Sequence, residues 1–380
     1  MSTGVGSRLE SLKADLPSVG IWLASRLAVF VTAIYASWVF TGPAGVFFGA
    51  AGELQPERSP VSMWDRWDVE WYRSIAEDGY LAAGHENNTA FPPGLPLLLR
   101  GFHAIGIDIT ISGLVISLVA GLIAAIALGR LTQEAGGTPA LGVLAWVVAP
   151  MAVFLAAPYA EGLFAAFAFW AWYLARHGFW VWAGALAAIA TLVRVNGLFL
   201  AAGLVVMLLT GDRRAWRRGS ALLLPFLAAG AYAAYLHSLT GSWTAWLDAQ
   251  SVGWGREFGS PIEALRMTYE MAFTNGVASS FAVQYRLEIG FMAVAVAFAV
   301  VLAIKRWWGE FTFVALTCIA LGTSTLFYSV PRSLLTLFPI WVLLGVWMSR
   351  RRSVMVVYLA VCAPMMLIGT AAFVMGRWVA

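Results

Sequence analysis

Long apolar runs separated by short polar stretches dominate the chain. Most runs approach the roughly 20 residues that a helix needs to cross the hydrocarbon core of a bilayer. We predict about eleven spans, within a range of about nine to twelve. They lie near residues 19–40, 110–131, 139–156, 159–175, 178–193, 195–210, 218–239, 286–304, 309–328, 333–348 and 354–375. The pattern predicts an all-α polytopic membrane protein with one membrane-embedded domain over residues 1–380.

The composition agrees with a membrane location. Of the 380 residues, 61% are hydrophobic and only 12% are charged, which is about half the charge of an average soluble domain. The arginines occur in short clusters between apolar runs, a spacing that indicates membrane topology and not a nucleic-acid partner. Cys318 and Cys362 both lie inside apolar runs, so we expect neither a disulfide framework nor a metal site from them.

The basic clusters predict how the spans are oriented. They contain Arg8, Lys13, Arg130, Arg176, Arg213, Arg214, Arg217, Arg218, Lys305, Arg306, Arg350, Arg351 and Arg352. With eleven spans and a cytoplasmic N-terminus, all of these residues fall on the cytoplasmic side, as the positive-inside rule requires. The acidic and proline-marked segments then fall on the outer side. We therefore predict a multi-pass protein of the plasma membrane with an extracytoplasmic active site.

Two external loops carry most of the polar chemistry. The predicted order is a first span at 19–40, an external loop at 41–109, spans two to seven at 110–239, an external loop at 240–285 and the last spans at 286–380. In the first loop, residues 62–80 fit one amphipathic helix, and the proline-broken segment 91–106 is too short to cross the membrane. In the second loop, residues 261–273 begin at a proline and predict another interfacial helix.

The helix predicted at residues 62–80 has two adjoining faces. One is an aromatic and apolar stripe suited to a membrane interface, formed by Trp64, Trp67, Trp71 and Ile75. Asp65, Asp68 and Tyr72 lie beside that stripe. Ser62 and Asp65 have capping-box spacing, which gives Asp65 a structural role, whereas Asp68 lies mid-helix without one. Asp68 is therefore the better candidate for a catalytic base; a solvated helix flank is the alternative for both carboxylates.

The outer ends of later spans supply cations. Arg194 and Asn196 lie in a turn between two spans of about 16 residues, or roughly 24 Å, shorter than the roughly 30 Å hydrocarbon core. This turn is expected below the outer surface, where an arginine needs water or an anionic partner. Arg194 and Arg332 suit a phosphate, with headgroup anchoring as the alternative, and Asn196 adds a neutral donor. Glu161 begins another span, where it either complements the helix dipole or supports an arginine.

Several sequence motifs of the chain, which occur in the order given below, resemble those of the PIG-V family of mannosyltransferases. The first pair comprises the stretch from Arg66 to Ala76 with Gly79-Tyr80, and then Ala90-Phe91-Pro92-Pro93-Gly94-Leu95-Pro96. The later pieces are Pro158-Tyr159-Ala160-Glu161, the stretch from Ala190 to Gly197, and Arg332 with Phe338-Pro339. Pro92 stands where the family usually has a second Phe, and Ser333 where it has a Tyr. These departures leave the chemistry intact and bear on acceptor specificity.

The resemblance implies a GT-C membrane glycosyltransferase, which takes a sugar from a polyprenyl-phosphate carrier and inverts the anomeric centre. It also implies that Asp68 is the acid residue of the first external loop. We expect Arg194, Asn196 and Arg332 to bind the phosphate and sugar of the donor. Supporting or acceptor-side roles are expected for Asp65, Trp67, Trp71, Tyr72, Tyr159 and Glu161. Mannose as the sugar, and a glycolipid or lipoglycan as the acceptor, rest on the resemblance.

The sequence leaves several alternatives open. The same chemistry with arabinose, glucose or galactose is one, and a transporter or flippase for a lipid-linked sugar is another. The transporter predicts internal repeats, and we find no convincing repeat. No metal site or cofactor is firmly predicted, although a divalent cation between Asp65, Asp68 and a phosphate is conceivable. The predicted partners are a polyprenyl-phosphate-sugar donor, a glycolipid acceptor and the lipid bilayer, with no nucleic acid; the oligomeric state is not specified.

Overall fold

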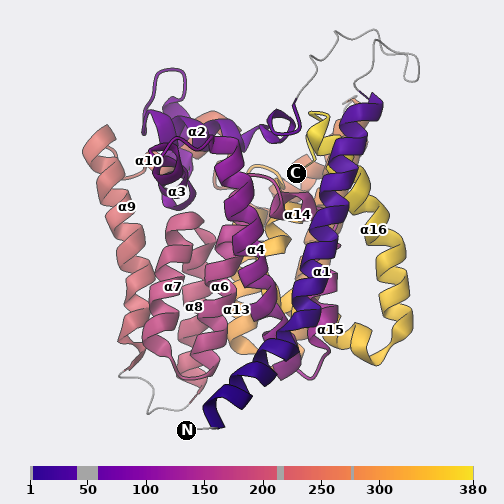
Figure 1. The fold of residues 1–380 in the computed structure, drawn as a ribbon. Helices are drawn as coiled ribbons and strands as arrows, with labels where there is room; N and C mark the ends of the chain where they lie inside the picture. The colour runs from indigo at the N-terminus through magenta and orange to yellow at the C-terminus, as the bar shows by residue number, and fades with distance from the viewer. Residues whose placement is uncertain (1–2, 41–58, 212–217, 275–277, 380) are drawn as a thin grey trace.

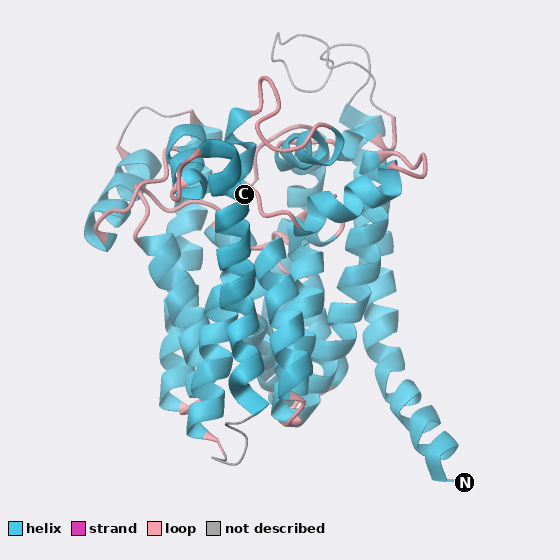
Figure 2. Ribbon diagram, turned by 90° about the vertical axis from the view of Figure 1, so that its left-hand side faces the viewer, coloured by secondary structure: helices cyan, strands magenta, loops and turns pink. Residues whose placement is uncertain are grey.

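A computed structural model describes residues 3–40, 59–211, 218–274 and 278–379. Within these ranges the ordered elements are all helices, and no strand occurs. Figure 2 shows long helices running side by side, with shorter helices and most of the loops gathered at the end away from the N-terminus. The prediction of an all-α polytopic membrane protein is confirmed.

Five helical stretches in the described residues are long and apolar enough to cross a membrane. They lie in α1 (Thr3–Phe40), α4 (Ile109–Glu134), η5 (Arg218–Leu223) with α9 (Leu224–Thr240), α12 (Ser279–Ile304) and α16 (Arg352–Val374). A sixth is formed if the bent pair of α14 (Val330–Ser333) with η6 (Leu334–Thr336) and α15 (Phe338–Arg350), which turns by 78°, counts as one span. All of these coincide with predicted spans.

The remaining predicted spans are shorter helices. They are α5 (Pro139–Val147) with η3 (Ala152–Leu155), α6 (Ala160–Arg176), α7 (Trp180–Val193), α8 (Asn196–Thr210) and α13 (Trp308–Gly322). The 14 residues of α7 make a helix of about 21 Å, which is less than the hydrocarbon thickness. Every predicted run is therefore helical, but the count of eleven full spans stays a prediction.

The two ends of the bundle differ in chemistry. At the end that carries the N-terminus, Arg130 pairs with Asp15 at 2.7 Å and Arg176 with Glu134 at 2.7 Å. These contacts place two of the basic residues at one end, while Arg213, Arg214 and Arg217 lie outside the described residues. Figure 1 places α2 (Asp68–Glu77), α3 (Gly94–His103) and α10 (Ala245–Trp254) at the opposite end. Which end faces the cytoplasm stays a prediction.

The helix predicted over residues 62–80 is interrupted in the structure. A short 3-10 turn, η1 (Ser62–Trp64), precedes α2, and Trp67 between them has φ +46°, outside the helical region. The predicted lipid-facing stripe is also wrong at Trp64. Its indole is fully buried, with ring centroids 5.2 Å from Phe30 and 6.1 Å from Phe373. Protein packing, not lipid, holds this aromatic face.

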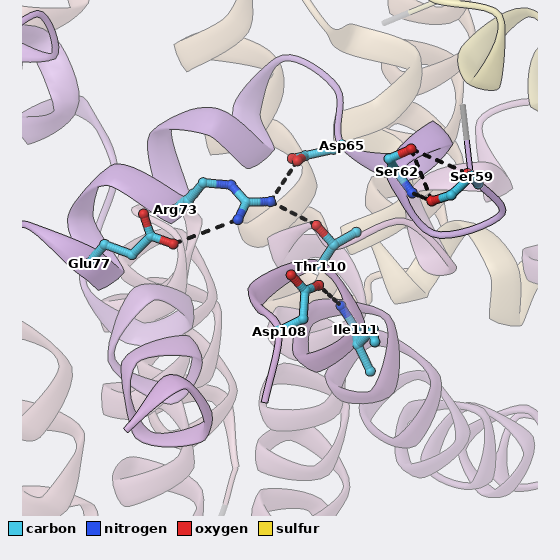
Figure 3. Close-up of polar contacts among 8 residues, drawn as sticks. All are labelled: Ser59, Ser62, Asp65, Arg73, Glu77, Asp108, Thr110 and Ile111. Atoms are coloured by element: carbon cyan, nitrogen blue, oxygen red, sulfur yellow. Dashed lines mark hydrogen bonds and ion pairs between the residues drawn. The ribbon is translucent and has the colours of Figure 1, made fainter. Parts of the chain in front are cut away.

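The predicted capping box is wrong as well. Ser62 hydrogen-bonds to Ser59, and Asp65 forms an ion pair with Arg73 at 2.6 Å, as Figure 3 shows. Asp68 is the first residue of α2 and not a mid-helix residue. By contrast, the interfacial helix predicted at 261–273 corresponds in its bounds to α11 (Pro261–Phe273), with Ser260 capping its first turn.

Candidate active site

Four charged side chains meet at the end of the bundle that carries α2. Arg332 donates from Nη1 to Oδ2 of Asp68 at 2.7 Å and from Nε to Oε1 of Glu161 at 2.5 Å. Arg194 donates from Nη1 to the same Glu161 oxygen at 2.5 Å. Carboxylates and guanidiniums therefore alternate, in the order Asp68, Arg332, Glu161 and Arg194. We call these four residues the charged cluster.

The charged cluster is assembled from distant parts of the chain. Asp68 begins α2, Glu161 lies in the first turn of α6, Arg194 ends α7, and Arg332 lies in α14. The Glu161 side chain is 0% exposed, Arg332 is 10% exposed, and Asp68 and Arg194 are each 19% exposed. Buried charges are tolerated when they are paired, and two carboxylates with two guanidiniums leave the cluster formally neutral.

Some polar atoms of the charged cluster remain unused. Oε2 of Glu161 and Nε of Arg194 are buried without a hydrogen-bond partner in the described part of the chain. Oδ1 of Asp68 likewise accepts no hydrogen bond from those residues, since its only contact is through Oδ2. A buried polar atom without a partner is costly. These atoms are therefore available to hydrogen-bond with a substrate group.

Aromatic rings hold Arg332 in place. Its guanidinium carbon lies 4.5 Å from the ring centroid of Tyr159 and 4.9 Å from that of Phe154, a cation–π arrangement. The Tyr159 hydroxyl donates to the Arg66 carbonyl at 2.9 Å. Tyr72 packs edge-on against Tyr159 at 6.3 Å. Burial raises the pKa of Tyr72, and the negative charge of Asp68 raises it further, so its hydroxyl remains a hydrogen-bond donor.

A carboxylate that sequence reasoning missed positions the backbone around Arg332. Glu288 of α12 is fully buried and accepts the backbone N–H groups of Ser329 at 3.0 Å and Val330 at 2.7 Å. These are the two residues that start α14, whose exposed N–H groups need acceptors. Ser329 has φ +59°, so the chain turns sharply there. The sequence did contain a signal for Glu288, because a carboxylate inside the predicted span 286–304 needs a functional or structural explanation.

Asp65 and Asn196 do not join the charged cluster through hydrogen bonds. The carboxylate of Asp65 is used by Arg73, which also reaches Thr110 at 2.9 Å and Glu77 at 3.6 Å, as Figure 3 shows. Asn196 begins α8 and makes no side-chain hydrogen bond within the described ranges. Those ranges contain no group of three or more His, Cys, Asp or Glu side chains placed to hold a metal ion.

Trp67 and Trp71 make aromatic contacts at the edge of the site. Trp67 packs against Phe373 at 5.4 Å. Trp71 stacks on Phe91 at 6.0 Å and contacts Trp254 at 5.4 Å. The contact between Trp71 and Trp254 joins the two loops that were predicted to be external. The functional roles predicted for all of these residues stay predictions, but the structure brings Asp68, both arginines and Glu161 into one place.

Two largely apolar cavities lie near the turn that follows α7. One of about 410 Å³ is lined by Tyr80, Pro96, Leu192 and Tyr232 among others. The second, of about 270 Å³, shares Leu192 and Tyr232 and is also lined by Val195, which follows Arg194 directly. Apolar space therefore reaches the turn that carries a cation of the cluster.

Comparison with known proteins gives matches to part of the chain. The family profile described as Mannosyltransferase (PIG-V) matches residues 57–213. The chain is similar to GPI alpha-1,6-mannosyltransferase 2 of Mus musculus, 36% identical over 146 residues, and of Homo sapiens, 37% identical over 146 residues. Each match covers 35% of this chain and 29% of the relative's length.

The matched region contains three members of the charged cluster. Asp68, Glu161 and Arg194 lie inside it, whereas Arg332 lies beyond its end. Most of the sequence motifs that resemble the PIG-V family also lie within residues 57–213. The family prediction is therefore confirmed. Residues 57–213 match the mannosyltransferase (PIG-V) family, and the similarity to the mouse and human proteins supports the same family.

Proposed function

We propose that this membrane protein transfers a mannosyl residue from a polyprenyl-phosphate-mannose donor to a glycolipid or lipoglycan acceptor at the extracytoplasmic face. The observation that carries the proposal is the charged cluster, in which a partly exposed aspartate shares one guanidinium with a buried glutamate. Membership of a mannosyltransferase family supports the sugar. The similar mouse and human proteins are named GPI alpha-1,6-mannosyltransferase 2, which supports a glycolipid acceptor.

Asp68 is the proposed general base. The acceptor hydroxyl oxygen attacks the anomeric carbon of the sugar while its proton passes to the Asp68 carboxylate. The bond between that carbon and the phosphate oxygen breaks, and its electron pair leaves with the phosphate. Attack opposite the leaving group inverts the anomeric centre. Arg332 fixes Oδ2 of Asp68, which leaves Oδ1 to receive the proton.

The leaving group needs positive charge more than it needs a proton, because polyprenyl phosphate leaves as an anion. Arg194 and Arg332 supply preorganised N–H donors in a largely buried place, where such donors act most strongly. Tyr72 supplies a neutral hydroxyl beside them. The apolar cavities next to Val195 and Tyr232 are suited to the first part of a prenyl tail.

The test is transfer by the purified protein. Radiolabelled polyprenyl-phosphate mannose is incubated with the protein and a membrane lipid extract, and label is followed into new lipids. The Asp68→Asn variant should lose about 10²- to 10⁴-fold in rate, the usual contribution of a general base. Asp78→Asn is the matched control, since Asp78 is exposed at the other end of the same helix and should transfer at the parent rate.

Two results would count against the proposal. Near-normal transfer by a folded Asp68→Asn protein would remove the base. Movement of intact donor between leaflets of a vesicle, without label in any new lipid, would instead indicate a flippase.

A further inference from the structure

Arg256 is a half-buried cation that has no ion-pair partner in the described part of the chain. It lies in the loop between α10 and α11, and within the described residues it forms no ion pair. Its Nε is buried without a hydrogen-bond partner. Within the described residues its side chain packs on a ring, with the guanidinium carbon 5.3 Å from the ring centroid of Tyr328. An arginine in this state has N–H donors left for a ligand.

The backbone around Arg256 is held firmly. Gly255, with φ +60°, ends α10, and its carbonyl accepts from Oγ1 of Thr325 at 2.7 Å. The same hydroxyl oxygen accepts the N–H of Glu257 at 3.1 Å. Thr325 thus clamps the residues on both sides of Arg256 to the segment that leads into α14. Arg256 is therefore preorganised on the same support as Arg332.

The charge of Arg256 acts on the charged cluster. Burial lowers the pKa of Arg256, the nearby charge of Asp68 opposes that shift, and the positive charge of Arg332 adds to it. Glu288, the other buried carboxylate in this region, uses its oxygens to accept N–H groups from Ser329, Val330 and Gln284. Glu288 therefore attracts Arg256 electrostatically without forming an ion pair with it, and the N–H donors of Arg256 are not taken up by a carboxylate of the described residues.

We infer that Arg256 binds the phosphate of the lipid-linked sugar donor and holds the polyprenyl phosphate that leaves. This inference rests on the proposed function. Arg332 is shared between Asp68 and Glu161, and Arg194 is paired with Glu161, so their charges are already compensated. A phosphodiester donor carries one negative charge, and the guanidinium of Arg256 can pair with it because no carboxylate of the described residues forms an ion pair with Arg256. Arginine is suited to grip phosphate oxygens through two parallel hydrogen bonds.

The experiment compares binding of two probes to the full-length protein in detergent. Decaprenyl phosphate carries the anion, and decaprenol has the same tail without it. Arg256→Gln should weaken binding of decaprenyl phosphate by about 10- to 100-fold, the usual range for a lost charged hydrogen-bonding group, and leave decaprenol binding unchanged. Arg256→Lys should restore part of the loss. In transfer assays, the KM for polyprenyl-phosphate mannose should rise more than kcat falls.

Arg266→Gln is the matched control. Arg266 lies on α11 in the same loop region, is 63% exposed and pairs with Glu263, so its loss should leave both probes bound as before. If Arg256→Gln binds decaprenyl phosphate as the parent does, the inference is wrong although the proposed function stands. Equal weakening of both probes would show a structural role and also overturn it. If the parent protein neither binds decaprenyl phosphate nor transfers mannose, the proposed function itself fails.

Discussion

Replacing Glu161 with glutamine should destabilise the protein by about 3 kcal/mol, the lower end of the cost of breaking a buried ion pair. Glu161 is completely buried and receives both Arg194 and Arg332 on one oxygen at 2.5 Å. Glutamine keeps the shape and one acceptor oxygen, so the change is mainly one of charge. The four-residue cluster then passes from neutral to a net charge of one positive unit.

The magnitude follows from opposing terms. Two unit charges about 4 Å apart attract by about 4 kcal/mol at an effective dielectric constant near 20, and Glu161 has two such partners. Desolvation of a buried ion offsets several kcal/mol of this attraction. The remainder is lost in the variant, which also leaves two guanidiniums sharing the single carboxylate of Asp68.

A double-variant cycle separates charge from shape. Arg194→Gln alone should also destabilise, but the protein carrying both Glu161→Gln and Arg194→Gln has a neutral cluster again. Its loss should be smaller than the two single losses together by about 2 kcal/mol or more. Thermal midpoints are measured in one detergent at one scan rate, because unfolding of such a protein is governed by rates. Single losses that add within about 0.5 kcal/mol would show that the pair is not coupled and refute this reasoning.

Two further predictions concern the support of the site. Glu288→Gln should lower kcat/KM for transfer by about 10-fold, because an amide cannot accept both N–H groups that start α14 and a small displacement of Arg332 is costly in rate. The control is Glu310→Gln, at another buried glutamate, on α13. Equal activity losses in the two variants would contradict a positioning role for Glu288. Gly113→Ala should destabilise by about 1–3 kcal/mol, since its Cβ would lie 2.4 Å from Cβ of Pro158. The same change at Gly290, which has nothing within 4 Å, should be tolerated, and thermal midpoints decide between the two.

The apolar pattern was sufficient to predict the helical framework. Runs of Leu, Val, Ala and Phe bury or face lipid regardless of their partners, so each predicted span appears as a helix. Their lengths were less certain from the sequence. The run at 139–156 divides into α5 and η3, and the run at 309–328 ends as a helix at Gly322. Such breaks depend on packing partners, which a hydropathy pattern does not contain.

The stretch at 62–80 shows where local pattern fails. The tryptophans and carboxylates keep helical spacing throughout, and nothing in the sequence marks Trp67 as a residue with positive φ. The break follows from tertiary contacts, because Trp64 is drawn into the core beside Phe30 and Phe373. Helical periodicity therefore identified the side chains of the site, but it did not predict the break in the helix at Trp67.

The charged residues were predicted unevenly for a related reason. Asp68, Glu161, Arg194 and Arg332 lie in motifs or at span ends, where a charge needs an explanation, and the sequence pointed to each. Arg256 lies in a loop that is already rich in polar and aromatic residues. Its significance comes from what it lacks, a carboxylate partner, and only the three-dimensional structure shows that.

The distribution of charge along the chain has a consequence for function. The family-matched segment 57–213 contributes Asp68, Glu161 and Arg194 to the site, which leaves an excess of one negative charge. The region beyond it contributes Arg332, which neutralises the cluster, together with Arg256 and the nearby buried Glu288. A site with an excess of negative charge would repel a phosphate-linked donor. Binding of such a donor should therefore depend on the second half of the chain, even though the proposed base lies in the first.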